Sequence, residues 1–259
     1  MGYYDTTYGA KLPDEMRREI YGRDIGQQSW LTAAQQEHFA QLAGFARGTR
    51  LLEIGCGAGG PALFLCETLG LSVVGIDSNR TGIDAANAAA RTRGLNAEFL
   101  CADAAARLPV GDASFDAVQC IDAINHLGGR VGVLCEWRRV LKPGGVVLFT
   151  DPVVVSGQVT AQELALRSAI GAFVFLPPGE NERLLREAGF EVEAVEDVTD
   201  TEAEISARRI EARDKRRDAL AAREGRDAFE STQLFLAAVH ALSSSRRLSR
   251  LMYLGRKLT

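Results

Sequence analysis

Residues 52–60 read LEIGCGAGG, an apolar run that passes into a loop with glycines at positions 55, 57, 59 and 60. Pro61 follows directly, and proline is favoured in the first turn of a helix. Glycine lets a backbone approach a ligand closely and adopt positive φ angles. This order of strand, glycine loop and helix predicts a turn that binds a nucleotide or a nucleoside. Its spacing also fits the GxGxxG pattern of dinucleotide enzymes, so the loop alone leaves both ligands open.

Beyond this loop, short apolar segments alternate with alanine-rich helical ones. Helices are expected over 61–69 and 83–93, and strands over 51–54, 72–76, 97–101, 117–120 and 146–150. Strands separated by single helices form βαβ units on a parallel sheet, and ligands bind at the carboxyl ends of such strands. The pattern therefore predicts an α/β fold, a Rossmann-like sheet flanked by helices.

Two acidic residues follow neighbouring strands of this predicted sheet. Asp77 ends the second strand, where a carboxylate can accept hydrogen bonds from both ribose hydroxyls. Asp103 follows the third strand in the segment CADAA, in a position to face an adenine edge. Each could instead be a helix N-cap. As a pair they favour a nucleoside without phosphates.

Taken together, the glycine loop and the acidic pair make the sequence similar to the class I S-adenosylmethionine-dependent methyltransferases. The resemblance rests on the glycine loop, Asp77, Asp103, SFDAVQCIDAINHL (residues 114–127) and RVLKPGG (139–145). It covers roughly half to two thirds of the chain, and ordinary dinucleotide domains lack the VLKPGG turn. The family implies a seven-stranded sheet whose last strand is antiparallel, with 190–198 and 250–257 as the final pair.

The resemblance also implies the cofactor, S-adenosyl-L-methionine, which leaves as S-adenosyl-L-homocysteine. Residues 21–29 (YGRDIGQQS) would close over its methionine part, with Gln28 as the main contact. The cofactor-binding residues implied by the family pattern are Tyr21, Gln28, Gly55, Cys56, Gly57, Gly59, Asp77, Ser78, Ala102, Asp103, Ala104, Cys120 and Ile121.

The segment DAINHL (residues 122–127) is similar to small-molecule N- and O-methyltransferases, notably phosphoethanolamine N-methyltransferases and natural-product sugar O-methyltransferases. Those families imply that His126 lies beside the transferred methyl group and that Asp151 belongs to the catalytic site. An imidazole can take a proton near neutral pH, so His126 is the expected general base. Asp151 could orient the imidazole or hold the substrate hydroxyl. His126 could also be a capping or packing residue, and Asp122 either an amine contact or a solvated loop carboxylate.

The chain divides into three expected parts. Residues 1–49 form N-terminal cap helices, 50–152 the cofactor-binding core, and 153–259 cap insertions with the last two strands. The apolar stretch 153–178 shows no clear strand partner. The charged stretch 201–226 is either a solvated helix face or part of a lid whose inner face carries Phe229, Leu234 and Phe235.

Composition narrows the class further. The 259 residues are 46% hydrophobic and 25% charged, with a formal net charge of −4, which is typical of a globular protein and argues against a nucleic-acid partner. No apolar run approaches the roughly 20 residues that cross a bilayer. The five cysteines form no CxxC pair, which favours free thiols in a reducing compartment. We therefore expect a cytoplasmic monomer or homodimer without a metal site or membrane partner.

These observations favour transfer of a methyl group to a hydroxyl or amine of a small molecule, as in secondary metabolism. Several alternatives stay open. The chain could be a non-catalytic partner subunit that binds S-adenosylmethionine, or a C-methyltransferase acting on a quinone- or lipid-like acceptor. A nicotinamide oxidoreductase fits the glycine loop but gives residues 142–145 no role. A methyltransferase of macromolecules usually needs a basic surface, which the composition does not indicate.

Overall fold

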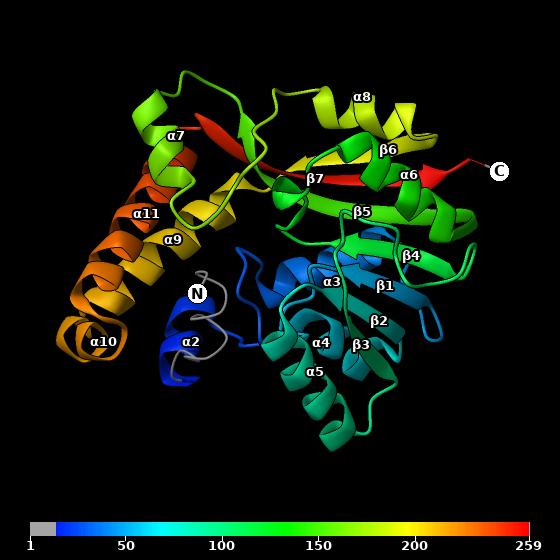
Figure 1. The fold of residues 1–259 in the computed structure, drawn as a ribbon, viewed down its shortest axis with the longest axis horizontal. Coiled ribbons are helices and arrows are strands. Elements are labelled where there is room, and N and C mark those ends of the chain that lie inside the picture. Colours follow the sequence, from blue (N-terminus) through cyan, green and yellow to red (C-terminus); the bar gives the residue numbers. More distant parts are fainter. Residues whose placement is uncertain (1–13, 259) are drawn as a thin grey trace.

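The strands form one seven-stranded sheet in the order β3-β2-β1-β4-β5-β7-β6, in a computed structural model that describes residues 14–258. Figure 1 shows helices on both faces of this sheet and a helical cap at one end. The strands are β1 (Arg50–Ile54), β2 (Ser72–Asp77), β3 (Ala97–Cys101), β4 (Phe115–Cys120), β5 (Leu141–Val155), β6 (Phe190–Asp197) and β7 (Leu248–Lys257). β1 to β5 pair in parallel, whereas β7 is antiparallel to both of its neighbours. The predicted fold class is confirmed.

The sheet lies between two hydrophobic cores. On one face pack α3 (Ala33–Leu42), α4 (Gly60–Leu69) and α5 (Arg80–Arg93); on the other pack α6 (Arg130–Val140) and α8 (Glu180–Glu187). On the second face, the Phe149 ring lies between Trp137 and Tyr253 at centroid distances of 6.0 and 4.9 Å. This two-sided burial explains why the central strands read as continuous apolar runs.

β5 is longer than the sequence indicates. It continues past Thr150, and Val154 and Val155 pair with β7 after a register shift at Asp151. The expectation that 153–178 has no strand partner is therefore wrong for its first residues. The shift arises where Pro152 interrupts the strand, since proline cannot donate a ladder hydrogen bond.

The cap has a hydrophobic core of its own. The helices of the cap are α2 (Asp14–Tyr21), α7 (Ala161–Arg167), α9 (Thr199–Asp214), α10 (Arg217–Glu224) and α11 (Arg226–Ser244). Figure 1 shows α9 and α11 side by side at the end of the sheet, in agreement with their close packing. Within the expected N-terminal part, α2 joins the cap core while α3 packs on the sheet, and residues 1–13 lie outside the described residues.

The inner face of α11 agrees in part with the predicted lid. Phe229 and Phe235 are buried in the cap core, but Leu234 is 57% exposed and points away from it. The error has a simple cause, because consecutive residues of a helix cannot share one narrow face. Among residues 14–258, no helix combines the length and apolar character needed to cross a bilayer.

A buried ion pair fastens two helices to β5. The Asp151 carboxylate accepts hydrogen bonds from Arg130 Nη1 of α6 at 2.5 Å and from Asn181 Nδ2 of α8 at 2.9 Å. Both charged side chains are almost fully buried. The carboxylate for which the sequence predicts a catalytic role is therefore occupied within the protein interior and does not line the cavity described below.

We expect Asp151→Ala to lower the free energy of unfolding by about 3–5 kcal/mol, because it leaves the Arg130 charge buried without its partner. Urea denaturation measures the change. The control is Arg246→Ala, which breaks ion pairs with Asp197 and Asp200 on the surface and should cost at most about 1 kcal/mol. Equal losses in the two variants would contradict the assignment.

Candidate active site

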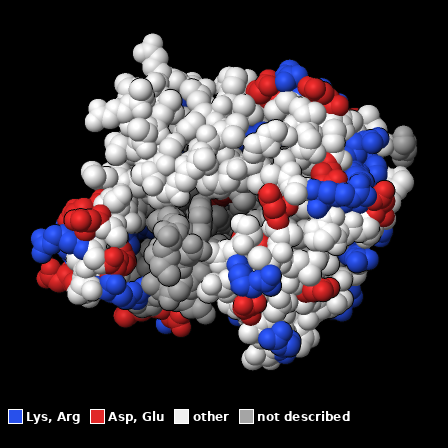
Figure 2. Space-filling view, in the orientation of Figure 1, with Lys and Arg blue, Asp and Glu red and all other residues white. Residues whose placement is uncertain are grey.

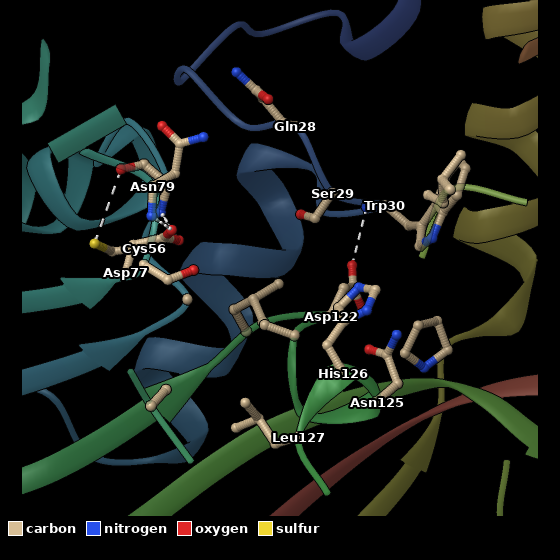
Figure 3. Close-up of a pocket in the computed structure, with 18 of the residues that line it drawn as sticks. Gln28, Ser29, Trp30, Cys56, Asp77, Asn79, Asp122, Asn125, His126 and Leu127 are labelled. Atoms are coloured by element: carbon tan, nitrogen blue, oxygen red, sulfur yellow. Dashed lines mark hydrogen bonds between the residues drawn. The ribbon is translucent and has the colours of Figure 1, made fainter. Parts of the chain in front are cut away.

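A cavity of about 590 Å³ opens between the carboxyl ends of the parallel strands and the cap. Figure 3 shows residues from the loop before α3, from the ends of β1 and β2 and from the segment after β4 converging on it. The cavity lies at the edge where an α/β sheet ordinarily binds its ligand. Its cofactor-side lining includes Gln28, Gly55, Cys56, Gly57, Asp77, Ser78, Asp103, Ala104 and Ile121, and its far side includes Trp30, Asn125, His126, Leu127, Arg167, Ile170, Phe173, Arg209 and Phe235.

The glycine loop after β1 leaves no room for a side chain at Gly55 or at Gly60. Gly55 has φ +68°, and a Cβ there would lie 2.5 Å from Ala123 Cβ. A Cβ on Gly60 would lie 2.4 Å from the carbonyl oxygen of Gly26, in the loop that covers the cavity. The glycines thus bring three backbone segments together around a ligand-sized space.

Asp77 keeps its carboxylate at the cavity wall. One oxygen accepts a hydrogen bond from Gly57 N and the other from Asn79 N, each at 2.8 Å. The helix N-cap is Asn79, whose side chain accepts from Gly82 N, so the N-cap alternative for Asp77 is wrong. Each carboxylate oxygen can accept a further hydrogen bond. Because Asp77 lines the cavity, a bound ligand could donate it.

Asp103 also lines the cavity, and the same oxygen-rich side of the site therefore carries two carboxylates. Its Oδ1 accepts a hydrogen bond from Ala105 N at 2.8 Å, which shapes a turn. No α-helix begins at this turn in the described part of the chain, so Asp103 is not a helix cap.

Four other residues predicted to bind the cofactor do not line the cavity. Tyr21 is buried in the cap core, and its hydroxyl donates to the carbonyl of Ser29. Cys120 is fully buried within β4. Gly59 and Ala102 flank residues that line the wall but are themselves set back from it. Gly59, Ala102 and Cys120 are each next to a lining residue in sequence, whereas Tyr21 is five residues from the nearest one, Gly26.

His126 lies at the cavity wall with one ring nitrogen bound to the backbone. It ends η1 (Ile124–His126), the 3₁₀ turn after β4, and Nδ1 lies 3.0 Å from the carbonyl oxygen of Ala172. A carbonyl only accepts, so Nδ1 carries the proton and Nε2 is the basic nitrogen. The ring packs on Phe173 at 4.5 Å, and burial lowers the pKa of His126 below its ordinary value of 6.5. The neutral imidazole thus prevails at neutral pH.

Asp122 joins the cap loop to the sheet. Its carboxylate accepts hydrogen bonds from Trp30 N at 2.9 Å, from Arg250 Nε at 2.7 Å and from Thr150 Oγ1 at 2.7 Å. Its φ of +53° is strained for a residue other than glycine. The side chain is 4% exposed, so the alternative of a solvated carboxylate is wrong, and its partners are residues of this chain.

The far side of the cavity is aromatic and contains two arginines. Arg209 stacks 4.5 Å from the Trp30 ring, and its guanidinium donates to the carbonyl oxygens of Gln28 and Ser29. Arg167 lies 4.9 Å from the Phe173 ring. Both arginines lie beyond residue 153, in the part of the chain where no motif identified them in advance.

Glu202 neutralises Arg167 from beneath the cavity wall. The two side chains form a buried ion pair at 3.2 Å, and burial raises the pKa of Glu202 to about 7. Pro152, Ile170 and Phe235 complete the apolar lining around this pair.

Comparison with known proteins shows which proteins share this sequence pattern and fold. Residues 52–149 match the model of a methyltransferase domain family. This part of the chain is similar to a methyltransferase domain. The fold around this domain is the class I S-adenosylmethionine-dependent one, as the sequence predicts, and S-adenosylmethionine is the cofactor of such domains.

Two curated relatives illustrate how this domain varies. The chain is 32% identical over 173 residues to 27-O-demethylrifamycin SV methyltransferase of Amycolatopsis mediterranei, covering 65% of this chain and 63% of the relative. It is 35% identical over 142 residues to sterol 24-C-methyltransferase ERG6B of Gibberella zeae, covering 54% and 36%. The chain therefore spans less than two thirds of the length of either.

Solved structures carry the same fold around the methyltransferase domain. Phosphoethanolamine N-methyltransferase 2 of Haemonchus contortus, solved with S-adenosylhomocysteine, superposes with a TM-score of 0.81 at 22% identity, covering 99% of this chain and 58% of that one. The [4+2]-cyclase SpnF superposes at 0.72 with 26% identity, covering 92% and 86%.

The residues of the cavity fit S-adenosylmethionine. The glycine loop makes a cradle that a Cβ would fill, and Asp77 presents acceptor capacity suited to ribose hydroxyls. In the loop above, Gln28 Oε1 is buried at the cavity wall and has no hydrogen-bond partner among residues 14–258. An ammonium or hydroxyl of a ligand would satisfy this oxygen.

We expect Gly55→Ala to raise the dissociation constant of S-adenosylhomocysteine at least about tenfold, since the new methyl group enters the space between the loop and Ala123. Calorimetric titration gives the constant. Gly44→Ala is the matched control: Gly44 also has positive φ (+71°), but open space surrounds its Cβ position. In both variants an alanine must adopt a positive φ, which costs about 1–2 kcal/mol of folding free energy. Unchanged affinity in Gly55→Ala would contradict the cradle.

Proposed function

We propose that this protein is a methyltransferase that moves the methyl group of S-adenosylmethionine to a hydroxyl or amine of a small molecule, with His126 as general base. The observation that carries the proposal is the position of His126. Its Nδ1 proton is committed to Ala172, its ring lines the cavity, and its basic nitrogen is neutral at physiological pH. A packing histidine needs none of these three properties.

The protein's share of this chemistry is positioning and proton transfer. When bound, S-adenosylmethionine supplies a methyl group that its sulfonium makes electrophilic. Asp77, Gln28 and the glycine loop would hold the adenosine and methionine parts at the ends of β1 and β2. Holding two reactants in line contributes on the order of 7–11 kcal/mol to barrier lowering.

His126 completes the acceptor side. As the acceptor oxygen or nitrogen attacks, its proton passes to Nε2, and the imidazole becomes an imidazolium that later returns the proton to solvent. The Ala172 carbonyl keeps Nδ1 protonated and the ring fixed throughout. A base positioned in this way contributes roughly 10²–10⁴-fold.

The cap defines which molecules reach this base. The far wall is formed by Trp30, Phe173 and Phe235, which favours an acceptor with an apolar body. On the face in Figure 2, acidic and basic side chains are interspersed, which suits a small molecule better than a nucleic acid. Similarity to the rifamycin methyltransferase supports the predicted place in secondary metabolism.

C-methylation is the second candidate. Several relatives are named as sterol 24-C-methyltransferases, at 32–36% identity to this chain. On such an acceptor, a carbon–carbon double bond would attack and His126 would remove a proton from carbon afterwards. The [4+2]-cyclase SpnF has a similar fold, and one fold can host several reactions.

The decisive experiment uses S-adenosylmethionine carrying a CD₃ group and a panel of apolar alcohols, amines and alkenes, with mass spectrometry locating the label. We expect label on oxygen or nitrogen. His126→Ala should lower turnover roughly 10²–10⁴-fold while S-adenosylhomocysteine affinity persists, because only the base is lost.

His38→Ala is the matched control. His38 is half exposed on α3 and pairs with Glu196 on the surface, so its loss should not change turnover. Wild-type turnover in His126→Ala would remove the general-base assignment, and label on carbon would favour the second candidate.

The pH profile supplies an independent check. A base works only when unprotonated, and the pKa of His126 lies below 6.5. We therefore expect kcat/KM to rise with pH along a limb whose midpoint is below 6.5, and then to level off. Glu202 also titrates, with a pKa of about 7, so Glu202→Gln should retain the limb and His126→Ala should lose it. A midpoint above 6.5 would argue against His126 as the base.

A further inference from the structure

The side-chain amide of Asn125 is buried without hydrogen bonds. Asn125 precedes His126 in η1, lines the cavity and is 0% exposed. Neither Nδ2 nor Oδ1 has a hydrogen-bond partner among residues 14–258. Buried polar side chains nearly always have partners, so an amide with both ends unpaired indicates a missing one.

Comparable buried amides in this protein are satisfied. Gln36 and Gln119 exchange hydrogen bonds with each other between α3 and β4. Asn181 donates to Asp151 and accepts from Arg130. Asn125, beside the proposed base, differs from these amides in that both of its amide atoms lack partners among residues 14–258, and leaving an amide unpaired costs folding free energy.

The backbone around Asn125 belongs to the acceptor side of the cavity. Its carbonyl accepts a hydrogen bond from Val174 N at 2.7 Å, and His126 Nδ1 bonds to Ala172 in the same segment. Figure 3 shows Asn125 and His126 together, on the opposite side of the cavity from Asp77 and Asn79. The group that pairs with this amide is thus expected on the acceptor.

We propose that Asn125 reads a polar group of the acceptor that neighbours the methylated atom, and that the acceptor class is apolar molecules with two adjacent oxygen substituents. This inference rests on the proposed function. An amide donates through Nδ2 and accepts through Oδ1, and a hydroxyl group can do the complementary two. Asn125 and His126 line the same side of the cavity (Figure 3), so the recognised oxygen lies on the part of the acceptor next to the atom that loses its proton. Leu127 and Phe173 provide the apolar surroundings.

Such an amide selects strongly against acceptors that lack the second oxygen. A site built to hydrogen-bond a substrate group rejects the analogue without it, because the buried polar atoms then stay unpaired. Residues 14–258 supply no replacement partner for either amide atom. Naphthalene-2,3-diol and 2-naphthol form a suitable probe pair, since they share one apolar body and differ by one adjacent hydroxyl.

The experiment measures calorimetric binding of each probe to protein saturated with S-adenosylhomocysteine. We expect wild type to bind the diol at least about tenfold more tightly than 2-naphthol. Asn125→Leu should abolish this preference and change 2-naphthol affinity by less than about threefold. Asn125→Asp, which lacks the donor, should also lose most of the preference, and it provides the test if the leucine variant folds poorly. A preference that persists in both variants would overturn the proposal.

Thermal melting separates recognition from packing. Removing two unpaired polar atoms should leave the melting temperature of Asn125→Leu equal to or above that of wild type. The control, Asn181→Leu, removes an amide with partners and should lower the melting temperature. A comparable fall in Asn125→Leu would assign Asn125 to packing and overturn the proposal, as would a tenfold loss of S-adenosylhomocysteine affinity, which would assign the amide to the cofactor.

Transfer of the CD₃ label distinguishes this inference from the function on which it rests. Selective binding of the diol that depends on Asn125, without label transfer, would support the recognition site and contradict methyl transfer. Label transfer to both probes at equal kcat/KM would support methyl transfer and overturn the recognition site.

Discussion

The Asp122 carboxylate holds together three parts of the chain that are distant in sequence. It binds the backbone of Trp30 in the cap loop, the side chain of Thr150 on β5 and the guanidinium of Arg250 on β7. A charge with so little exposure is stable only when paired, and here Arg250 supplies the pair. The roof of the cavity therefore depends on an interaction formed within the sheet, and the strained φ of Asp122 is maintained by these contacts.

The cavity combines two structural sources. Its cofactor side comes from the ends of β1 and β2, where glycines and Asp77 leave little freedom for change. Its acceptor side comes from η1 and the cap, including Arg167, Arg209 and Phe235, which pack in or against a separate core. Substitutions in the cap can therefore alter the acceptor while the cofactor side is retained, which agrees with the range of relatives that share this domain.

Sequence reasoning recovered the sheet because its strands are buried on both faces and separated by helices of ordinary length. It placed the glycine loop, Asp77 and His126 at the cavity because the spacing of glycines and acidic residues marks the ends of the strands, and because the resemblance to methyltransferases implied the position of His126. It assigned Asp151 to catalysis because position along β5 does not reveal that Arg130 and Asn181 occupy the carboxylate. It missed Asn125 as well, although this residue adjoins His126, because an unpaired amide becomes visible only when its neighbours are known.

The position of β7 has a consequence for biosynthesis. β7 lies between β5 and β6 and carries Arg250, so the partner of Asp122 belongs to the last strand of the sheet. A nascent chain that has emerged only as far as α11 holds the glycine loop, Asp77 and His126, but lacks the cation that neutralises Asp122. Such a chain also leaves the edge of β5 unpaired, a state in which strands associate with other chains. The contacts of Asp122 therefore form only after β7 has emerged, and an intermediate on the ribosome exposes an aggregation-prone edge until β7 inserts.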